Sequence, residues 1–279
     1  MGAFFVSSVM YKSVPFISFP ERYLGERPVK FPLLVNNPGY FAINKPAGIA
    51  CFRHDWTLGT PDISMALRRE ILNEKPQLKA LGLEGLFRVF KLDAELSGAL
   101  IFAKTVEWEE ILRNAFGSRQ IVFKYHFLAT TESDERERFC DLPLAQHSNQ
   151  ERMLVSHKTG KKCETRFRYL RSFKRYQLWE ADTSDFRMHQ LRLHASERDL
   201  QIVGEDLYSK GERIFLSMIK RGYRQNKGTE EPIYDQLAAH LVSVEFKVPD
   251  QELPGVFAPL PRGFEVLLKF LERHRGPRG

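Results

Sequence analysis

Asp93 is the residue whose surroundings in this sequence best fit catalysis. It stands in the segment 90–98, FKLDAELSG, which is followed at once by the apolar run 99–103. The Ser and Gly predict a turn, and the apolar run predicts a buried strand. A carboxylate at the start of a buried strand is held on a rigid frame where substrates bind, so it could act as a nucleophile or a proton acceptor. Judged alone, an Asp at this place is more often an ordinary turn residue.

The segment 188–194, MHQLRLH, is the second group of polar side chains with chemical potential. Its two histidines suggest metal binding, but His189 and His194 would be about 140° apart on a helix and on opposite faces of a strand. We therefore expect no metal site here. Arg192 shares a helical face with His189. A buried arginine needs a carboxylate partner, and we expect Arg192 to pair with Asp93.

Hydrophobic periodicity and turn residues predict the elements that must position these side chains. Strands are expected at 39–52 with a turn at Lys45 to Gly48, after Asp93, at 120–130, at 165–169 and 176–181 as a hairpin, and at 239–248. Helices are expected at 62–72, 106–116, 186–196 and 263–273, with Ser184 and Asp185 capping the third of these. The charged segment 133–140 is expected to be a loop, and 209–235 a long basic connection.

Strands and helices follow each other without a steady βαβ alternation. This pattern predicts an α+β fold, with a mixed, largely antiparallel central sheet flanked by helices. We divide the chain into an N-terminal arm at 1–29, one catalytic domain at 30–272 and a basic mobile tail at 273–279. The apolar residues 1–20 lack a basic leading region and are interrupted by Lys12 and Pro15, so we expect neither a signal peptide nor a membrane anchor.

Composition narrows the class of partner. Lys and Arg outnumber Asp and Glu by 42 to 35, and the resulting charge of +7 with a pI near 9.3 suits a polyanion such as nucleic acid. Many basic proteins bind no nucleic acid, so charge alone leaves this open. The three cysteines, Cys51, Cys140 and Cys163, are far apart and lack metal-ligand spacing. They are typical of reduced thiols in a cytoplasmic protein.

Six segments in order resemble the motifs of the RluA family of pseudouridine synthases. They are INKPAGIACF, KLDAELSGALIFAK, FKYHFLA, SDFRMHQLRLH, QIVGEDLY and AHLVSVEFKVP, and they run from about residue 40 to residue 250. Each is weak alone, but six in the family's order make a specific match. The resemblance implies the pseudouridine synthase fold and an enzyme that converts uridine to pseudouridine in RNA, either tRNA or rRNA. The small N-terminal RNA-binding domain common in the family is not expected in the 30 residues before the first motif.

The resemblance also implies roles for particular residues. Asp93 would be the catalytic carboxylate, Tyr125 the aromatic ring that stacks on the target uracil, and Arg192 the salt-bridge partner of Asp93. The other positions implied at or beside the substrate are Lys91, Leu191, Arg187, Lys124 and His189. The reaction breaks the C1′–N1 bond, rotates the bound uracil and joins C1′ to C5, so no cofactor is expected. Asp93 would attack C1′ or remove a proton from C2′, and Arg192 would lower its pKa.

The chain departs from the family pattern at five positions. They are Phe90 and Lys91 in place of His-Arg, Leu96 in place of Thr, and Phe186 and Met188 in place of Gly and Thr. We expect these changes to touch the pocket rim more than the catalytic trio, which predicts an active synthase with an unusual RNA target. The alternatives are an inactive relative that only binds RNA and a metal-dependent hydrolase that uses His189 and His194. We expect a monomer with no DNA or membrane partner.

Overall fold

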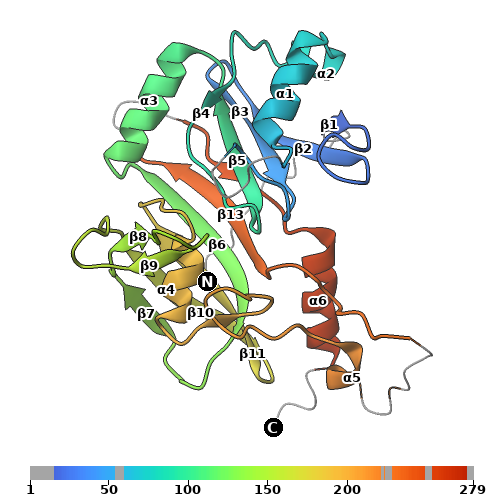
Figure 1. Ribbon diagram of the computed structural model, residues 1–279, viewed down its shortest axis with the longest axis vertical. Coiled ribbons are helices and arrows are strands. Elements are labelled where there is room, and N and C mark those ends of the chain that lie inside the picture. Colours follow the sequence, from blue (N-terminus) through green and yellow to red (C-terminus); the bar gives the residue numbers. More distant parts are fainter. Residues whose placement is uncertain (1–15, 54–59, 221–222, 224–227, 249–252, 275–279) are drawn as a thin grey trace, which may run out of the picture.

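One large sheet dominates the computed structural model, which describes residues 16–53, 60–220, 223, 228–248 and 253–274 (Figure 1). Its main strands follow the order β1-β2-β3-β5-β13-β6-β11-β10-β7, and β4, β12 and β14 pair with β5, β6 and β13. Its strands are β1 Phe16–Phe19, β2 Val29–Asn36, β3 Tyr40–Lys45, β4 Phe87–Arg88, β5 Ser97–Ala103, β6 Ile121–Thr130, β7 Glu137–Cys140, β10 Thr165–Phe173, β11 Tyr176–Thr183, β12 Gln201–Ile202, β13 Ala239–Phe246 and β14 Val256–Phe257. A separate ribbon consists of β8 Leu144–Gln146 and β9 Met153–Val155.

The sheet is mixed but largely antiparallel, as the sequence predicts. Along the main order only β13 and β5 run parallel to each other, and β13 pairs antiparallel with β6 on its other side. Every residue of β5 is buried, so its apolar run lies in the middle of the core. The α+β assignment is therefore confirmed, and the rigid centre of the molecule is the trio β5, β13 and β6.

The helices lie around this sheet (Figure 1). They are α1 Ile63–Leu72, α2 Pro76–Lys79, α3 Val106–Gly117, α4 Gln190–Ser196, α5 Leu216–Ile219 and α6 Arg262–Arg273. The α1 helix begins after Asp62, whose side chain accepts a hydrogen bond from the Met65 backbone N–H. No helix in the described ranges is long and apolar enough to cross a membrane.

Most of the elements expected from periodicity are confirmed. They are the helices at 62–72, 106–116 and 263–273, the strands at 120–130 and 239–248, and the hairpin of β10 and β11. The hairpin is longer than expected, because residues 171–173 of the basic segment continue β10 and only Lys174 and Arg175 form the turn. The expected turn after β3 is also present, with Gly48 at φ +83°, a conformation that favours glycine.

The loop expected at 133–140 is wrong in its second half, which forms the edge strand β7. Arg138 and Cys140 are buried, while Glu137 and Phe139 are exposed, so the segment alternates as a strand does. Charged side chains are common on edge strands, where they discourage pairing with other chains. The charged residues of this segment therefore reflect the position of β7 at the edge of the sheet.

The helix expected at 186–196 begins four residues later, at Gln190. Its N-cap is His189, which has φ +55° and makes no capping hydrogen bond with its side chain. Asp185 does not cap it, because its carboxylate accepts a hydrogen bond from the Glu164 N–H and pairs with Arg119 at 3.0 Å. The residues between Asp185 and α4 consequently form an irregular segment that faces the Asp93 loop.

Candidate active site

Asp93 lies in the loop between β4 and β5, immediately before the buried central strand. Its side chain is 5% exposed. Both carboxylate oxygens accept a hydrogen bond from the His189 backbone N–H, at 3.1 and 3.3 Å. The left-handed conformation of His189 at the start of α4 thus aims a backbone donor at the carboxylate. Two segments almost a hundred residues apart fix the position of this acid.

Asp93 lines two cavities. The inner cavity is lined by Asp93, Leu96, Tyr125, Phe186, Arg187 and Leu191, among others, and its volume is about 10 Å³. The outer cavity, of about 120 Å³, is lined by Asp93 together with Cys51, Phe52, Lys91, Glu95, Met188 and His189. The inner space is about that of one water molecule. A base could reach Tyr125 only if side chains in this wall moved.

Burial raises the pKa of the Asp93 carboxyl above its ordinary value. His189 when its ring is protonated, the charge of Arg192 and the His189 N–H oppose this shift, and Glu95 adds to it. Arg192 lowers the pKa of Asp93, as expected. The pKa is nevertheless raised overall, because the loss of solvent around the carboxylate has the larger effect. The charged form of Asp93 is thus costly in this closed site.

Arg192 does not pair with Asp93 as the sequence suggested. Its Nε and Nη2 donate to the two carboxylate oxygens of Glu205 at 2.6 and 2.9 Å, and its Nη1 lies 2.9 Å from Glu95 Oε1. Arg192 is 5% exposed and Glu205 1%. Glu205 also accepts the backbone N–H groups of Leu207 and Tyr208, so it is preorganised to receive the guanidinium fork. Arg192 acts on Asp93 only through its charge.

His189 is positioned by a second aromatic residue, Tyr208. The Tyr208 hydroxyl accepts a hydrogen bond from the Met153 N–H at 2.8 Å and lies 2.6 Å from His189 Nδ1. Burial lowers the pKa of His189, against the charge of Asp93. A neutral imidazole that accepts the Tyr208 hydroxyl proton at Nδ1 agrees with both observations. His189 therefore serves Asp93 through its backbone, while its ring is held by Tyr208.

Tyr125 shares the inner cavity with Asp93, as the resemblance implied. It lies on β6, opposite Ala181 of β11 and Leu241 of β13, and is 4% exposed. Burial, with the charge of Asp93 in support, raises the pKa of Tyr125 well above its ordinary value. The side chain is thus a neutral phenol, which can stack on a base or donate a hydrogen bond.

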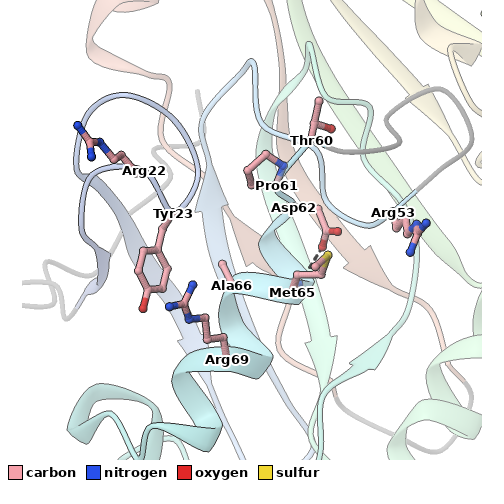
Figure 2. Close-up of a pocket in the computed structure, with 9 residues that line it drawn as sticks. All are labelled: Arg22, Tyr23, Arg53, Thr60, Pro61, Asp62, Met65, Ala66 and Arg69. Carbon is pink, nitrogen blue, oxygen red and sulfur yellow. Dashed lines mark hydrogen bonds between the residues drawn. The ribbon is translucent and has the colours of Figure 1, made fainter.

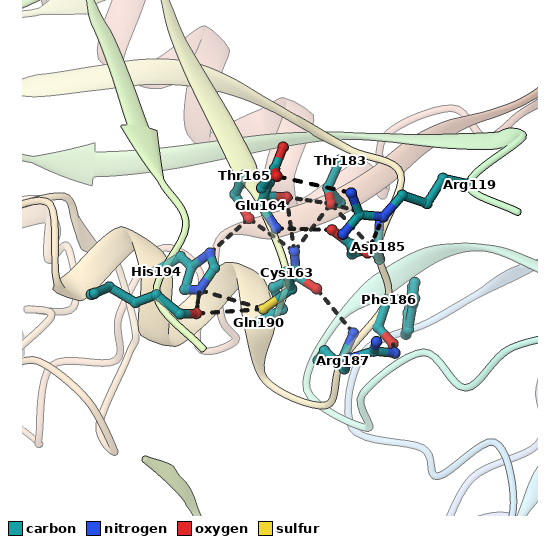
Figure 3. Close-up of polar contacts among 11 residues, drawn as sticks. Arg119, Cys163, Glu164, Thr165, Thr183, Asp185, Phe186, Arg187, Gln190 and His194 are labelled. Carbon is teal, nitrogen blue, oxygen red and sulfur yellow. Dashed lines mark hydrogen bonds and ion pairs between the residues drawn. The ribbon is translucent and has the colours of Figure 1, made fainter. Parts of the chain in front are cut away.

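A polar network in the wall of the inner cavity fixes the start of α4 (Figure 3). Gln190 Nε2 donates to the Thr165 and Thr183 hydroxyls and to the Glu164 carbonyl, and its Oε1 accepts the Arg187 N–H. The network continues to His194, whose Nδ1 lies 2.9 Å from the Thr165 hydroxyl and whose Nε2 lies 2.9 Å from the Leu142 carbonyl. In the described part of the chain no group of three or more His, Cys, Asp or Glu side chains could hold a metal ion.

The remaining candidate residues divide between the two cavities and the opposite face of the sheet. Leu191 and Arg187 line the inner cavity, and Lys91 lines the outer one. Burial lowers the pKa of Lys91, and the Asp93 charge opposes this shift. Lys124, next to Tyr125 on β6, lines neither cavity, because successive strand residues point to opposite faces. Its Nζ lies 2.6 Å from Glu245 Oε1 instead.

Replacing Lys124 by Met should therefore have little effect. Lys124 and Glu245 are 33% and 43% exposed, and a pair of this kind contributes about 0 to 1 kcal/mol. We expect the free energy of unfolding, measured by urea denaturation, to change by no more than that, with turnover of RNA unchanged. A loss of turnover at unchanged stability would return Lys124 to the substrate site.

The departures from the family pattern contact one another across the site. The rings of Phe90 and Phe186 lie 5.0 Å apart between centroids, and Lys91 Nζ lies 3.9 Å from Met188 Sδ. Phe186 also packs against Phe123 at 4.9 Å and, with Leu96, lines the inner cavity beside Asp93 and Tyr125. These changes thus form the walls of the cavities as well as their rim.

Glu205, Glu95 and Tyr208 are site residues that sequence reasoning missed. Glu205 and Tyr208 stand in the segment QIVGEDLY, which the sequence analysis used only as a motif. The signal was available, because Glu205 occupies the acidic position of that motif and a buried arginine requires such a partner. Glu95 lies two residues after Asp93 and points at the same arginine.

Comparisons with known proteins show which family this chain belongs to and which solved structure has a similar fold. The family model described as RNA pseudouridylate synthase matches residues 39–197. Ribosomal large subunit pseudouridine synthase D of Xylella fastidiosa is 26% identical over 246 residues, which are 86% of this chain and 69% of that protein. The protein of the same name from Yersinia pestis is 28% identical over 187 residues, 65% of this chain and 55% of that protein. The solved structure of human RNA pseudouridylate synthase domain containing 4 has a similar fold, with a TM-score of 0.66 and 22% identity over 86% of this chain and 92% of that one.

Proposed function

Because the chain belongs to the RNA pseudouridylate synthase family, we propose that it isomerises uridine to pseudouridine in RNA with Asp93 as the catalytic carboxylate. The observation that carries this proposal is the placement of Asp93. It is a buried acid at the head of the central strand, held by a backbone N–H, with a neutral phenol in one adjoining cavity and a lysine in the other. The names of the relatives favour ribosomal RNA over tRNA as substrate.

The proposed reaction uses these groups as follows. The target nucleoside leaves its stack and enters beside Asp93, at a cost of a few kcal/mol. The C1′–N1 bond breaks, the uracil turns while it is enclosed, and C1′ joins C5; C5 loses a proton and N1 gains one, so the product is an isomer of uridine. Asp93 either attacks C1′ and is released when C5 bonds to C1′, or removes a proton from C2′ to give a glycal and returns it to C2′ when C5 bonds to C1′. Tyr125 stacks on the uracil, a contact worth roughly 1 to 3 kcal/mol, and exclusion of water keeps the detached base from being lost.

Entry of the base requires the inner cavity to open. Phe186 and Leu96 form its wall, and a volume of about 10 Å³ holds no base. A neighbouring cavity of about 380 Å³ shares Phe186 and Arg187 with it and is also lined by Arg119, Lys161 and Lys162. Lys161 and Lys162 would bind the phosphates that flank the target nucleotide. The bound backbone would thus lie directly beside the wall that must move.

The test is pseudouridine mapping of total tRNA and ribosomal RNA from cells with and without the gene. We expect at least one pseudouridine to disappear without the gene and to return on complementation with the wild type but not with Asp93→Asn. Because the proposed reaction needs no cofactor or metal, the purified protein should form the same pseudouridine in the presence of a chelator. Identical maps in both cells would contradict the proposal, and return of the modification with the Asn variant would remove Asp93 from the catalytic role.

A further inference from the structure

A fourth cavity, of about 460 Å³, lies at the N-terminal end of α1 and includes neither Asp93 nor Tyr125 (Figure 2). Three parts of the chain form its walls. Arg22 and Tyr23 come from the turn between β1 and β2, Asp62 and Arg69 from the N-cap and first turns of α1, and Arg53 is the third part. The cavity is large enough for part of a nucleotide chain. Three of the side chains in its wall are arginines, and we call it the arginine cavity.

None of these arginines forms an ion pair within the described residues. Arg22, Arg53 and Arg69 are exposed, and no carboxylate of the described part of the chain pairs with them. By contrast, many arginines elsewhere in the molecule are paired, for example those at 119, 168, 175, 192 and 213. Three unpaired cations around one cavity favour an anionic ligand.

The position of Arg69 is fixed by its surroundings. Its guanidinium carbon lies 4.5 Å from the centroid of the Tyr23 ring, a cation–π contact that keeps the side chain beside the cavity (Figure 2). The neighbouring Glu70 carboxylate forms an ion pair with Lys75, whose Nζ lies 2.8 Å from Glu70 Oε2. The charge of Arg69 therefore remains available to a ligand.

Asp62 provides a second, independent indication of a ligand. Its Oδ1 accepts the Met65 N–H at the start of α1, at 2.8 Å. Its Oδ2 is buried and has no hydrogen-bond partner among the described residues, although the residue is only 1% exposed. A buried carboxylate oxygen without a donor costs free energy, which a ligand hydroxyl would recover. A ligand with both a phosphate and a hydroxyl group satisfies the arginines and Asp62 together.

The cavity is joined to the active site by the segment 50–53. The N–H groups of Ile63 and Ser64 donate to the carbonyls of Ala50 and Cys51, so the start of α1 is fixed to that segment. Residues 50–52 line the outer cavity beside Asp93, and Arg53 lines the arginine cavity. The guanidinium carbon of Arg88 lies 5.5 Å from the centroid of the ring of Phe52, which is next to Arg53 in the sequence. Cationic side chains thus lie at the outer cavity, over Phe52 and around the arginine cavity.

We propose that the arginine cavity is an accessory site for the RNA backbone, in which Arg22, Arg53 and Arg69 bind phosphate groups and Asp62 accepts a hydrogen bond from a ribose 2′-hydroxyl. The part of the RNA strand that binds in this cavity does not include the target nucleoside. It continues along Arg88 and Lys91. This assignment rests on the proposed function in that the ligand is the substrate RNA.

The test compares two triple variants of the full chain. In the site variant Arg22, Arg53 and Arg69 are replaced by Gln, and in the matched control the exposed residues Arg166, Arg262 and Arg273 are replaced by Gln. The probes are a long and a short transcript around the mapped uridine, the short one ending before it can reach the arginine cavity. With the long RNA we expect the site variant to raise KM about 10- to 100-fold with kcat unchanged. The slope of log binding constant against log salt should become less negative by about 2 to 3.

The outcomes separate this proposal from the proposed function. The short RNA should be modified equally by the wild type and the site variant. Equal salt slopes in the site and control variants, or an equal loss on the short RNA, would overturn the accessory site. If mapping finds no modified uridine, fragmented ribosomal RNA becomes the probe. A change in slope confined to the site variant then supports the accessory site while the isomerase proposal fails.

Asp62→Asn tests the hydroxyl contact separately. Asn is as good an N-cap as Asp, so its carbonyl can still accept the Met65 N–H while Oδ2 becomes an amide donor. We expect the preference for RNA over the same strand with 2′-deoxyribose to fall by at least about 5-fold. An unchanged preference would remove Asp62 from the site.

Discussion

Replacing Asp93 by Asn should lower the rate of pseudouridine formation by roughly 10³-fold or more and leave the protein at least as stable as the wild type. The amide has nearly the same shape, and its carbonyl can still accept the His189 N–H. It cannot attack C1′ or take a proton. Since burial makes the carboxylate costly, removing its charge should not destabilise the fold. Single-turnover kinetics and thermal unfolding at neutral pH measure the two effects.

The raised pKa of Asp93 fixes the sign of the pH dependence. Between the ordinary pKa and the raised one, the folded protein holds a proton that the unfolded chain has lost, so the contribution of Asp93 to stability falls as pH rises through this window. Activity has the opposite trend, because only the ionised form reacts. The wild type should lose activity on acidification at a higher pH than an ordinary carboxyl would give, and Asp93→Asn should lack the stability change.

Asp185→Asn is the matched control for this experiment. Asp185 is a buried carboxylate that lines the same inner cavity, but it pairs with Arg119 and accepts the Glu164 N–H. Its loss should lower the melting temperature and spare most of the rate. If Asp93→Asn behaved in the same way, Asp93 would be a structural acid and not the catalytic one.

Local sequence pattern was sufficient for most of the fold. The period of 3.6 residues in 62–72 and 263–273 predicts α1 and α6, and the aromatic and β-branched residues of 121–130 predict β6. The pattern failed where contacts between residues distant in sequence determine the local structure. Ser184 and Asp185 look like helix caps, yet Asp185 is recruited by Arg119 and Glu164, and α4 begins only at Gln190.

The sequence indicated some of the residues that gather around Asp93 but not how the polar side chains pair. Asp93 and Tyr125 follow from motif positions, and they share a cavity. The partner of Arg192 could not be deduced from type alone, because three acids lie within reach and the choice depends on backbone donors that orient Glu205. In the same way, Phe90 and Phe186 were noticed as separate departures, although they are in contact. Contact between residues so distant in sequence is visible only in the fold.

The pair of Arg192 and Glu205 is the other place where a single substitution should have a large effect. Replacing Glu205 by Ala leaves a guanidinium that is 5% exposed without its two-point partner, and Glu95, which is 45% exposed, gives weaker compensation. Breaking a buried pair in this way costs about 3 to 5 kcal/mol. We expect the free energy of unfolding, measured by urea denaturation, to fall by that amount. Glu205→Gln keeps an oxygen for the Leu207 and Tyr208 N–H groups and should lose less.

The control is the double variant Arg192→Met and Glu205→Leu, in which both charges are replaced by apolar side chains. Replacing a buried ion pair as a unit is often neutral or stabilising, so the double variant should be more stable than Glu205→Ala alone. It should still be impaired in turnover at low pH, because Arg192 is one of the charges that restrain the pKa of Asp93. Its acid limb should therefore move to higher pH than that of the wild type. If Glu205→Ala costs less than about 1 kcal/mol, the pair does not stabilise the start of α4. If the acid limb of the double variant stays in place, Arg192 does not act electrostatically on Asp93.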